Sequence, residues 1–174
     1  MKYFLNFIVI IVYLFFYNLS YSDSGLAYIN MEILMNKSKA GQSISVELEK
    51  EKEKNFKELK HIEKELKKEE DEIVSQKNIL KKEDYEKKIS ELRNKFKSYQ
   101  EKKNSKNKEL NLLRNSLGNK ILKNINEIMT EYSKNNSISL VIQKQSIIIG
   151  KTELDVTNDI LKLLNKKITK IDLD

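Results

Sequence analysis

Two long stretches of the chain, residues 43–80 and 84–132, carry apolar side chains at the spacing of amphipathic helices. In the first stretch Leu59, Leu66, Ile73 and Leu80 recur at every seventh position. This interval is typical of a coiled-coil seam, whereas a globular helix has a broader apolar face. Ser43 is the expected N-cap of this helix. The predicted seam of the first helix consists of Ile44, Leu48, Phe56, Leu59, Ile62, Leu66, Ile73 and Leu80.

The second stretch shows spacings of three and four residues and therefore predicts a second seam of the same kind. Asp84 is the expected N-cap of this helix. Lys103 and Lys106 fall at seam positions, where lysine side chains give less apolar burial than their neighbours. The other predicted seam residues are Tyr85, Ile89, Leu92, Phe96, Tyr99, Leu110, Leu113, Leu117, Ile121, Ile125, Ile128 and Tyr132.

The two helices are expected to fold back on each other as an antiparallel hairpin with its tip near residues 81–84. If the chain reverses there, apolar residues of one helix meet apolar residues of the other along the whole length. The register places Leu92 beside Ile73, Tyr99 beside Leu66 and Leu110 beside Phe56. Absence of Pro and scattered placement of the four Gly leave both helices without strong breakers.

Short β-branched runs surround the helical hairpin. Residues 26–29 predict a strand that leads into a short helix ending near Gly41, and residues 137–142 and 147–149 predict a hairpin or two neighbouring strands. A final helix is expected after Asp155. The fold class is therefore α+β and mainly helical, with a small strand body from residues 23–42 and 134–174 and an inserted arm at 43–133.

A body of two or three strands and one helix buries little apolar surface, so we expect it to assemble with further copies through its strands. The candidate residues for this homo-oligomeric contact are Tyr28, Ile29, Leu140, Val141, Ile142 and Ile148.

The first 22 residues have the pattern of an export signal. Lys2 precedes an unbroken apolar run from Phe7 to Phe16, and small residues at Ser20 and Ser22 predict cleavage after Ser22. The run is shorter than a standard membrane span of about 20 residues, although an uncleaved signal that anchors the protein stays an alternative. Absence of Cys excludes disulfides, thiolate metal sites and a thiol nucleophile.

Charge and motif content argue against catalysis. The formal charge is +7, and it rests on lysine because Arg93 and Arg114 are the only arginines. His61, the single histidine, lies in a helix rich in Lys and Glu without the partners that a metal or catalytic site needs. No phosphate loop or nucleophile motif is present, so we expect no enzyme, no cofactor and no metal site. A nucleic-acid partner conflicts with export and with the shortage of Arg.

The combined pattern resembles the Skp (OmpH) family of periplasmic chaperones. The similarity is carried by the export signal, the first strand Leu26–Met31, the charged helical hairpin, the strand at 139–142 and the closing segment Asp155–Lys162. The resemblance implies a homotrimer in the periplasm whose helical arms surround a cavity and hold unfolded outer-membrane proteins without ATP. Anionic lipid or lipopolysaccharide remains an open partner, since no segment of the arm matches the lipopolysaccharide-binding patch of the family.

The main functional hypothesis is thus a holdase that binds nonnative chains by many weak apolar contacts in a positive field. The alternative is a structural coiled coil of the envelope that uses the same heptads only for assembly. The candidate client-contact residues on the arm are Tyr85, Phe96, Tyr99, Lys103 and Lys106.

Overall fold

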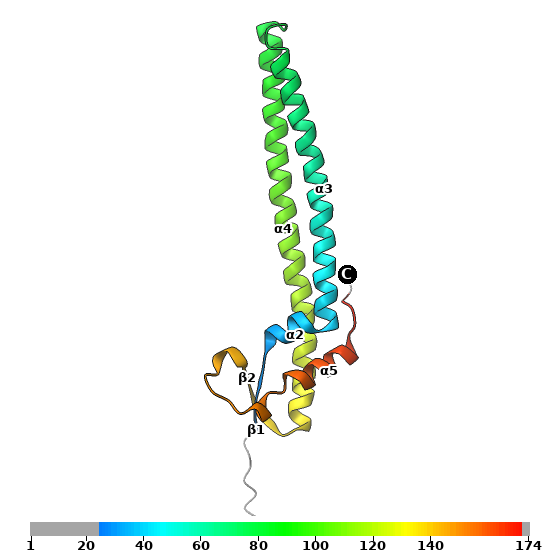
Figure 1. The fold of residues 1–174 in the computed structure, drawn as a ribbon, viewed down its shortest axis with the longest axis vertical. Coiled ribbons are helices and arrows are strands. Elements are labelled where there is room, and N and C mark those ends of the chain that lie inside the picture. Colours follow the sequence, from blue (N-terminus) through cyan, green and yellow to red (C-terminus); the bar gives the residue numbers. More distant parts are fainter. Residues whose placement is uncertain (1–24, 172–174) are drawn as a thin grey trace, which may run out of the picture.

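A computed structural model describes residues 25–171 and shows a long helical hairpin that rises from a small body (Figure 1). The predicted export signal at residues 1–22 lies outside the described residues. The α+β, mainly helical fold class is confirmed, and the two long helices form the expected antiparallel pair.

The hairpin consists of α3 (Lys39–Ser75) and α4 (Lys82–Asn135). Helix α3 begins before the predicted start at residue 43, because Ser38 and not Ser43 is its N-cap. The side-chain oxygen of Ser38 accepts a hydrogen bond of 3.0 Å from the backbone N–H of Gly41. Such a bond satisfies one of the backbone donors that every helix leaves unpaired at its first turn.

The tip differs from the prediction in its details. Helix α3 ends at Ser75, so Leu80 lies in the turn and not in the helix. Lys81 is the N-cap of α4, and Asp84 lies within the first helical turn. A carboxylate in that turn is favourable because the helix N-terminus carries a partial positive charge, which explains why Asp84 resembles a cap in the sequence. Ile79 in the turn is 82% exposed.

The body contains a two-stranded parallel sheet of β1 (Gly25–Ile29) and β2 (Ile138–Gln143). Tyr28 lies opposite Ile142, and Ala27 lies opposite Val141. The short helix α2 (Met31–Lys37) connects β1 to the arm. The chain thus leaves the body after β1, completes the whole arm and returns to place β2 beside its first strand (Figure 1).

The predicted strand at residues 147–149 is wrong. Its place is taken by an irregular segment between two short 3₁₀ helices, η1 (Lys144–Ser146) and η2 (Thr152–Leu154). Ile148 is 99% exposed and pairs with no strand within residues 25–171. The β-branched run is typical of a strand, but strand propensity depends strongly on tertiary context and is overridden here.

The last helix, α5 (Thr157–Lys167), is tied to the first strand by a polar network. The backbone N–H of Asn30 donates to Oγ1 of Thr157 at 2.8 Å, and that hydroxyl donates to Asp155. Lys144 forms an ion pair of 2.8 Å with Asp155. Burial raises the pKa of Asp155, but the hydrogen bonds from Lys144 and Thr157 outweigh it and hold the pKa below the ordinary value. The network therefore joins β1, η1 and α5.

Two separate apolar clusters stabilise the described part of the chain. The larger cluster joins the body to the base of the arm and includes residues of both strands and all four helices. The smaller cluster lies in the distal arm, between α3 and α4. The buried residues of the larger cluster are Ala27, Ile29, Leu34, Ala40, Ile44, Leu117, Ile121, Ile125, Ile128, Val156, Ile160 and Leu164.

Candidate functional site

The distal arm is held by a thin apolar seam. Leu66, Ile73 and Leu92 are buried between the two helices, as the predicted register requires. Tyr85 and Tyr99 pack against this cluster and are half-buried, so they help to join the helices. Of the three aromatic residues singled out as client contacts, Phe96 alone is exposed.

Polar contacts between the helices follow the same register. Lys95 of α4 bonds both carboxylate oxygens of Glu69 on α3, at 2.6 and 2.7 Å. Nearer the tip, Lys88 donates to the side-chain oxygen of Gln76 at 2.8 Å. These pairs agree with the predicted alignment to within about one helical turn.

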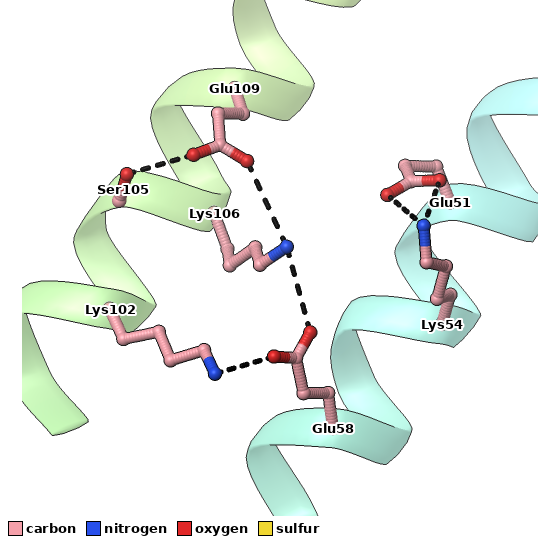
Figure 2. Close-up of polar contacts among 7 residues, drawn as sticks. All are labelled: Glu51, Lys54, Glu58, Lys102, Ser105, Lys106 and Glu109. Carbon is pink, nitrogen blue, oxygen red and sulfur yellow. Dashed lines mark hydrogen bonds and ion pairs between the residues drawn. The ribbon is translucent and has the colours of Figure 1, made fainter.

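In the middle of the arm, ion pairs connect α3 and α4. The carboxylate of Glu58 on α3 forms ion pairs with the ammonium groups of Lys102 and Lys106 on α4, at N···O distances of 2.5 and 3.5 Å (Figure 2). The ammonium group of Lys106 also lies 3.9 Å from the carboxylate of Glu109. The hydrogen bond from Lys102, together with the charges of both lysines, lowers the pKa of Glu58 below its ordinary value. Solvent-exposed pairs of this kind contribute little stability each, so they fix alignment more than they hold the helices together.

The two lysines predicted in the seam have different environments. Lys106 is the more enclosed, with 22% of its side chain exposed, and it is turned toward Glu58. Lys103 is exposed. A lysine stem can cover apolar surface while its ammonium group reaches a carboxylate, which explains why Lys106 tolerates a place near the seam.

Beside this ion-pair cluster, the seam contains a buried polar residue that sequence reasoning missed. Asn55 is buried, whereas Phe56, which was predicted in the seam, is 62% exposed. Counting back from Ile62 and Leu59 at intervals of three and four reaches residue 55 and not 56, so strict spacing identifies the position even though the residue is not apolar. The side-chain oxygen of Asn55 has no hydrogen-bond partner among the described residues.

Replacing Asn55 by leucine is therefore expected to stabilise the arm. An unpaired buried polar group costs about 1–3 kcal/mol, and leucine would add apolar contacts at the same seam position. We expect N55L to raise the free energy of unfolding by an amount within this range, measured by chemical denaturation. Asn115, which is exposed on α4, offers a control: N115L is expected to leave the stability nearly unchanged. A loss of stability in N55L would show that Asn55 has a partner in solution.

A groove of about 810 Å³ runs along the distal arm between α3 and α4. His61 and Tyr99 line it together with charged side chains of both helices. His61 is exposed, and the described residues contain no group of three or more His, Cys, Asp or Glu side chains that could hold a metal ion. The groove thus presents a mixed-charge surface that lacks a metal-binding arrangement.

Large apolar side chains are exposed elsewhere along the arm. They do not belong to either apolar cluster, so packing within this chain does not account for them. They are Val46, Phe56, Val74, Ile79, Phe96 and Leu112.

The body presents a second candidate surface at β2. In the described residues this strand pairs only with β1, which leaves its other edge open. Leu140 and Ile148 are exposed, while Val141 and Ile142 are half-buried. Open strand edges with apolar side chains are sites where another chain can add a strand.

Two residues predicted as oligomer contacts are already covered within the chain. Tyr28 and Ile29 are buried. The ring of Tyr28 is approached by the ammonium group of Lys144 at 5.6 Å, and the ring lies close to Gly150. Their side chains consequently serve the body of one copy.

The comparisons with known proteins agree with this architecture. A model of the family described as outer membrane protein (OmpH-like) matches residues 25–164. The chain belongs to the OmpH-like family. The match spans both strands, the arm and most of α5, so the OmpH-like assignment rests on the body as well as on the charged helices.

A solved structure supports the same fold. It is a Caulobacter crescentus CB15 protein described as OmpH-like and proposed to be an outer membrane chaperone. It shares 15% sequence identity with this OmpH-like chain at a TM-score of 0.81, over 86% of this chain and 89% of the other. A comparison with curated proteins gives no match. Within residues 25–171, no helix combines the length and the apolar character needed to cross a membrane.

Proposed function

We propose that this protein is an ATP-independent holdase chaperone of the periplasm that binds unfolded outer-membrane proteins between its helical arms and performs no catalysis. Membership of the OmpH-like family supports this role, as does the fold shared with a protein proposed to be an outer membrane chaperone. The observation that carries the proposal is the protruding arm, which exposes large apolar side chains outside its own seam.

The arm suits weak and reversible binding. When a nonnative segment covers an exposed apolar side chain, a modest area of apolar surface is removed from water. This burial stabilises the complex by roughly 25 cal/mol per Å². Several such contacts together delay aggregation of the client, and each one can be released without an energy source. The positive net charge attracts acidic clients over a distance that shrinks as salt screens the field.

We further propose a homo-oligomer, a trimer as in the Skp (OmpH) family, assembled through the body. Residues 23–42 and 134–174 would form this body, and residues 43–133 would form the arm. The open edge of β2 and the exposed side chains of Leu140, Ile148 and Ile149 support assembly there. Several arms projecting from one centre would enclose a space for the client.

The periplasmic location depends on the proposed export signal at residues 1–22, with cleavage after Ser22. The mass of the protein recovered from the periplasm would test the cleavage site. An uncleaved signal would leave the same arm and body tethered to the membrane.

Aggregation of a urea-diluted β-barrel protein provides the direct test. We expect the mature chain to suppress light scattering by the β-barrel at stoichiometric amounts without ATP. If scattering is unchanged while the mature chain still forms a trimer, the holdase proposal is wrong and a structural role for the arms remains.

A further inference from the structure

The two flanks of the arm differ in chemistry. We define the polar flank as the side of the α3–α4 pair that contains the groove. The hydrogen bonds and ion pairs that join the two helices in the distal and middle arm lie on this side: Lys88 with Gln76, Lys95 with Glu69, and Lys102 and Lys106 with Glu58. Figure 2 shows this side at the level of Glu58. None of the exposed large apolar side chains lines the groove.

The opposite side of the seam contains apolar residues. On α3, Phe56 starts a series of positions seven residues apart that continues through Glu63 and Glu70, and Val74 follows one helical turn later. On α4, Ile89 and Phe96 are also seven residues apart. In an antiparallel pair, positions on one side of both seams meet each other, as the polar contacts do on the other side. We define the apolar flank as Phe56, Val74, Ile89 and Phe96.

The arm itself does not require three of these four side chains, whereas Ile89 is half-buried and packs against the seam cluster. Phe56 is 62%, Val74 59% and Phe96 38% exposed, and none of the three belongs to the buried seam cluster. Within residues 25–171 no hydrogen bond or ion pair joins the two helices on this flank. A single exposed apolar residue needs no explanation, but an aligned set on one flank marks an interaction surface.

The charges around Phe96 indicate the kind of partner. Arg93 precedes Phe96 by about one turn, and Lys103 follows it by two turns on the same side of α4. Neither cation forms an ion pair with a carboxylate of the described residues. A segment that places apolar side chains on Phe96 and carboxylates near these cations would complement both features.

On the α3 side of this flank, Glu70 is already paired with Lys67 at 3.5 Å. The ammonium group of Lys60 lies 5.6 Å from the ring of Phe56, so the flank keeps positive charge beside both phenylalanines in spite of Glu63.

We propose that the apolar flank is the surface that receives apolar, acidic segments of a nonnative polypeptide, whereas the polar flank holds the two helices in register. This inference rests on the proposed holdase function and assigns that function to one side of the arm. It replaces Tyr85, Tyr99 and Lys106 by Phe56 and Val74 as client contacts, and it retains Phe96 and Lys103.

Three serine substitutions test the assignment in the full mature chain. The triple variant Phe56→Ser, Val74→Ser and Phe96→Ser removes the exposed apolar side chains of the flank. Leu163 lies on α5 in the body, away from the arm, and is exposed to an extent similar to that of Phe96, so Leu163→Ser is the control. Affinity for a urea-diluted acidic β-barrel protein is measured by fluorescence anisotropy, and circular dichroism and light scattering confirm helicity and mass.

The triple variant is expected to bind the client at least about tenfold more weakly, as loss of several partly buried apolar contacts implies, while the control binds nearly as tightly as the unaltered protein. Equal affinity of the triple variant and the unaltered protein would overturn the flank assignment and leave the holdase proposal intact. Failure of the unaltered protein to bind any client would overturn both.

Site-specific photocrosslinking gives a second readout that does not depend on the stability of the triple variant. A photoreactive amino acid at position 56 or 96 is expected to capture the client, and the same group at position 61 or 98, on the polar flank, is expected to capture little. Preferential capture from 61 or 98 contradicts the proposal. Capture of a second copy of the arm from 56 or 96 in the absence of client, or of lipid in vesicles, assigns the flank to that partner instead.

Discussion

Substitution of Ile121 by alanine is expected to lower the free energy of unfolding by about 2–5 kcal/mol, which is among the largest effects available to a single truncation in this chain. Ile121 is fully buried on α4, in the cluster that joins the arm to the body. The same cluster contains Ile44 of α3, Leu34 of α2 and Ile160 of α5. The cavity left by the lost methyl and methylene groups would therefore loosen the contact between the body and the base of the arm.

Chemical denaturation followed by circular dichroism measures this effect. Leu112→Ala on the same helix is the matched control, because Leu112 is 58% exposed and its truncation is expected to change stability by about 0.5 kcal/mol or less. Similar losses in both variants would mean that the base of α4 is not packed as the structure describes. An assembled protein links folding to association, so both variants are compared at one protein concentration.

Gly41→Ala is the second substitution with a large expected effect. Gly41 lies in the first turn of α3, where its Cα faces the backbone of Met35 at the end of α2. An added methyl group would overlap the carbonyl oxygen of Met35, and backbone atoms cannot move aside as a flexible side chain does. Crowding in a packed region costs about 1–3 kcal/mol and occasionally more, so α2 would have to shift away from α3.

A second glycine within a long helix provides the control with the opposite sign. Gly118 lies in α4, and an added methyl group there would only reach ordinary contact distance from the side chain of Met35. Alanine is the better helix former by about 1 kcal/mol, so Gly118→Ala is expected to raise the midpoint of thermal unfolding. If Gly41→Ala also stabilised the protein, the close contact between α2 and α3 would be contradicted.

The arm could be predicted from the sequence because its contacts repeat. Leu66, Ile73 and Leu92 stand at regular intervals, and the regularity defines both the helices and their alignment. The prediction was wrong at Phe56, which is exposed, because the buried seam position beside it is Asn55. The residues before Phe56 are mostly charged, so Phe56 was the apolar residue nearest to the expected position. Asn55 gives no hydrophobic signal at all.

The body could be predicted only in part. Local pattern identified β1 and β2, but their parallel pairing joins residues more than a hundred positions apart, and no local signal carries that information. The run at Ile147–Ile149 shows the same limit, because its sequence favours a strand but it pairs with neither β1 nor β2 in the described part of the chain. The flanks of the arm also required the structure, since they depend on which side of each seam faces its partner.

The parallel pairing of β1 with β2 has a consequence for the order of folding. During synthesis from the N-terminus, β1 is made long before β2. The hydrogen bond from the backbone N–H of Asn30 to Thr157 likewise joins residues 127 positions apart. The two helices of the arm can pair progressively from the tip, where the contacting residues are close in sequence. Once they have paired, β1 and β2 lie close together, so their pairing costs little further chain entropy. The helical hairpin would thus hold the two strands close together while the body folds. Substitutions in the distal seam are therefore expected to lower the rate at which the β1–β2 sheet forms.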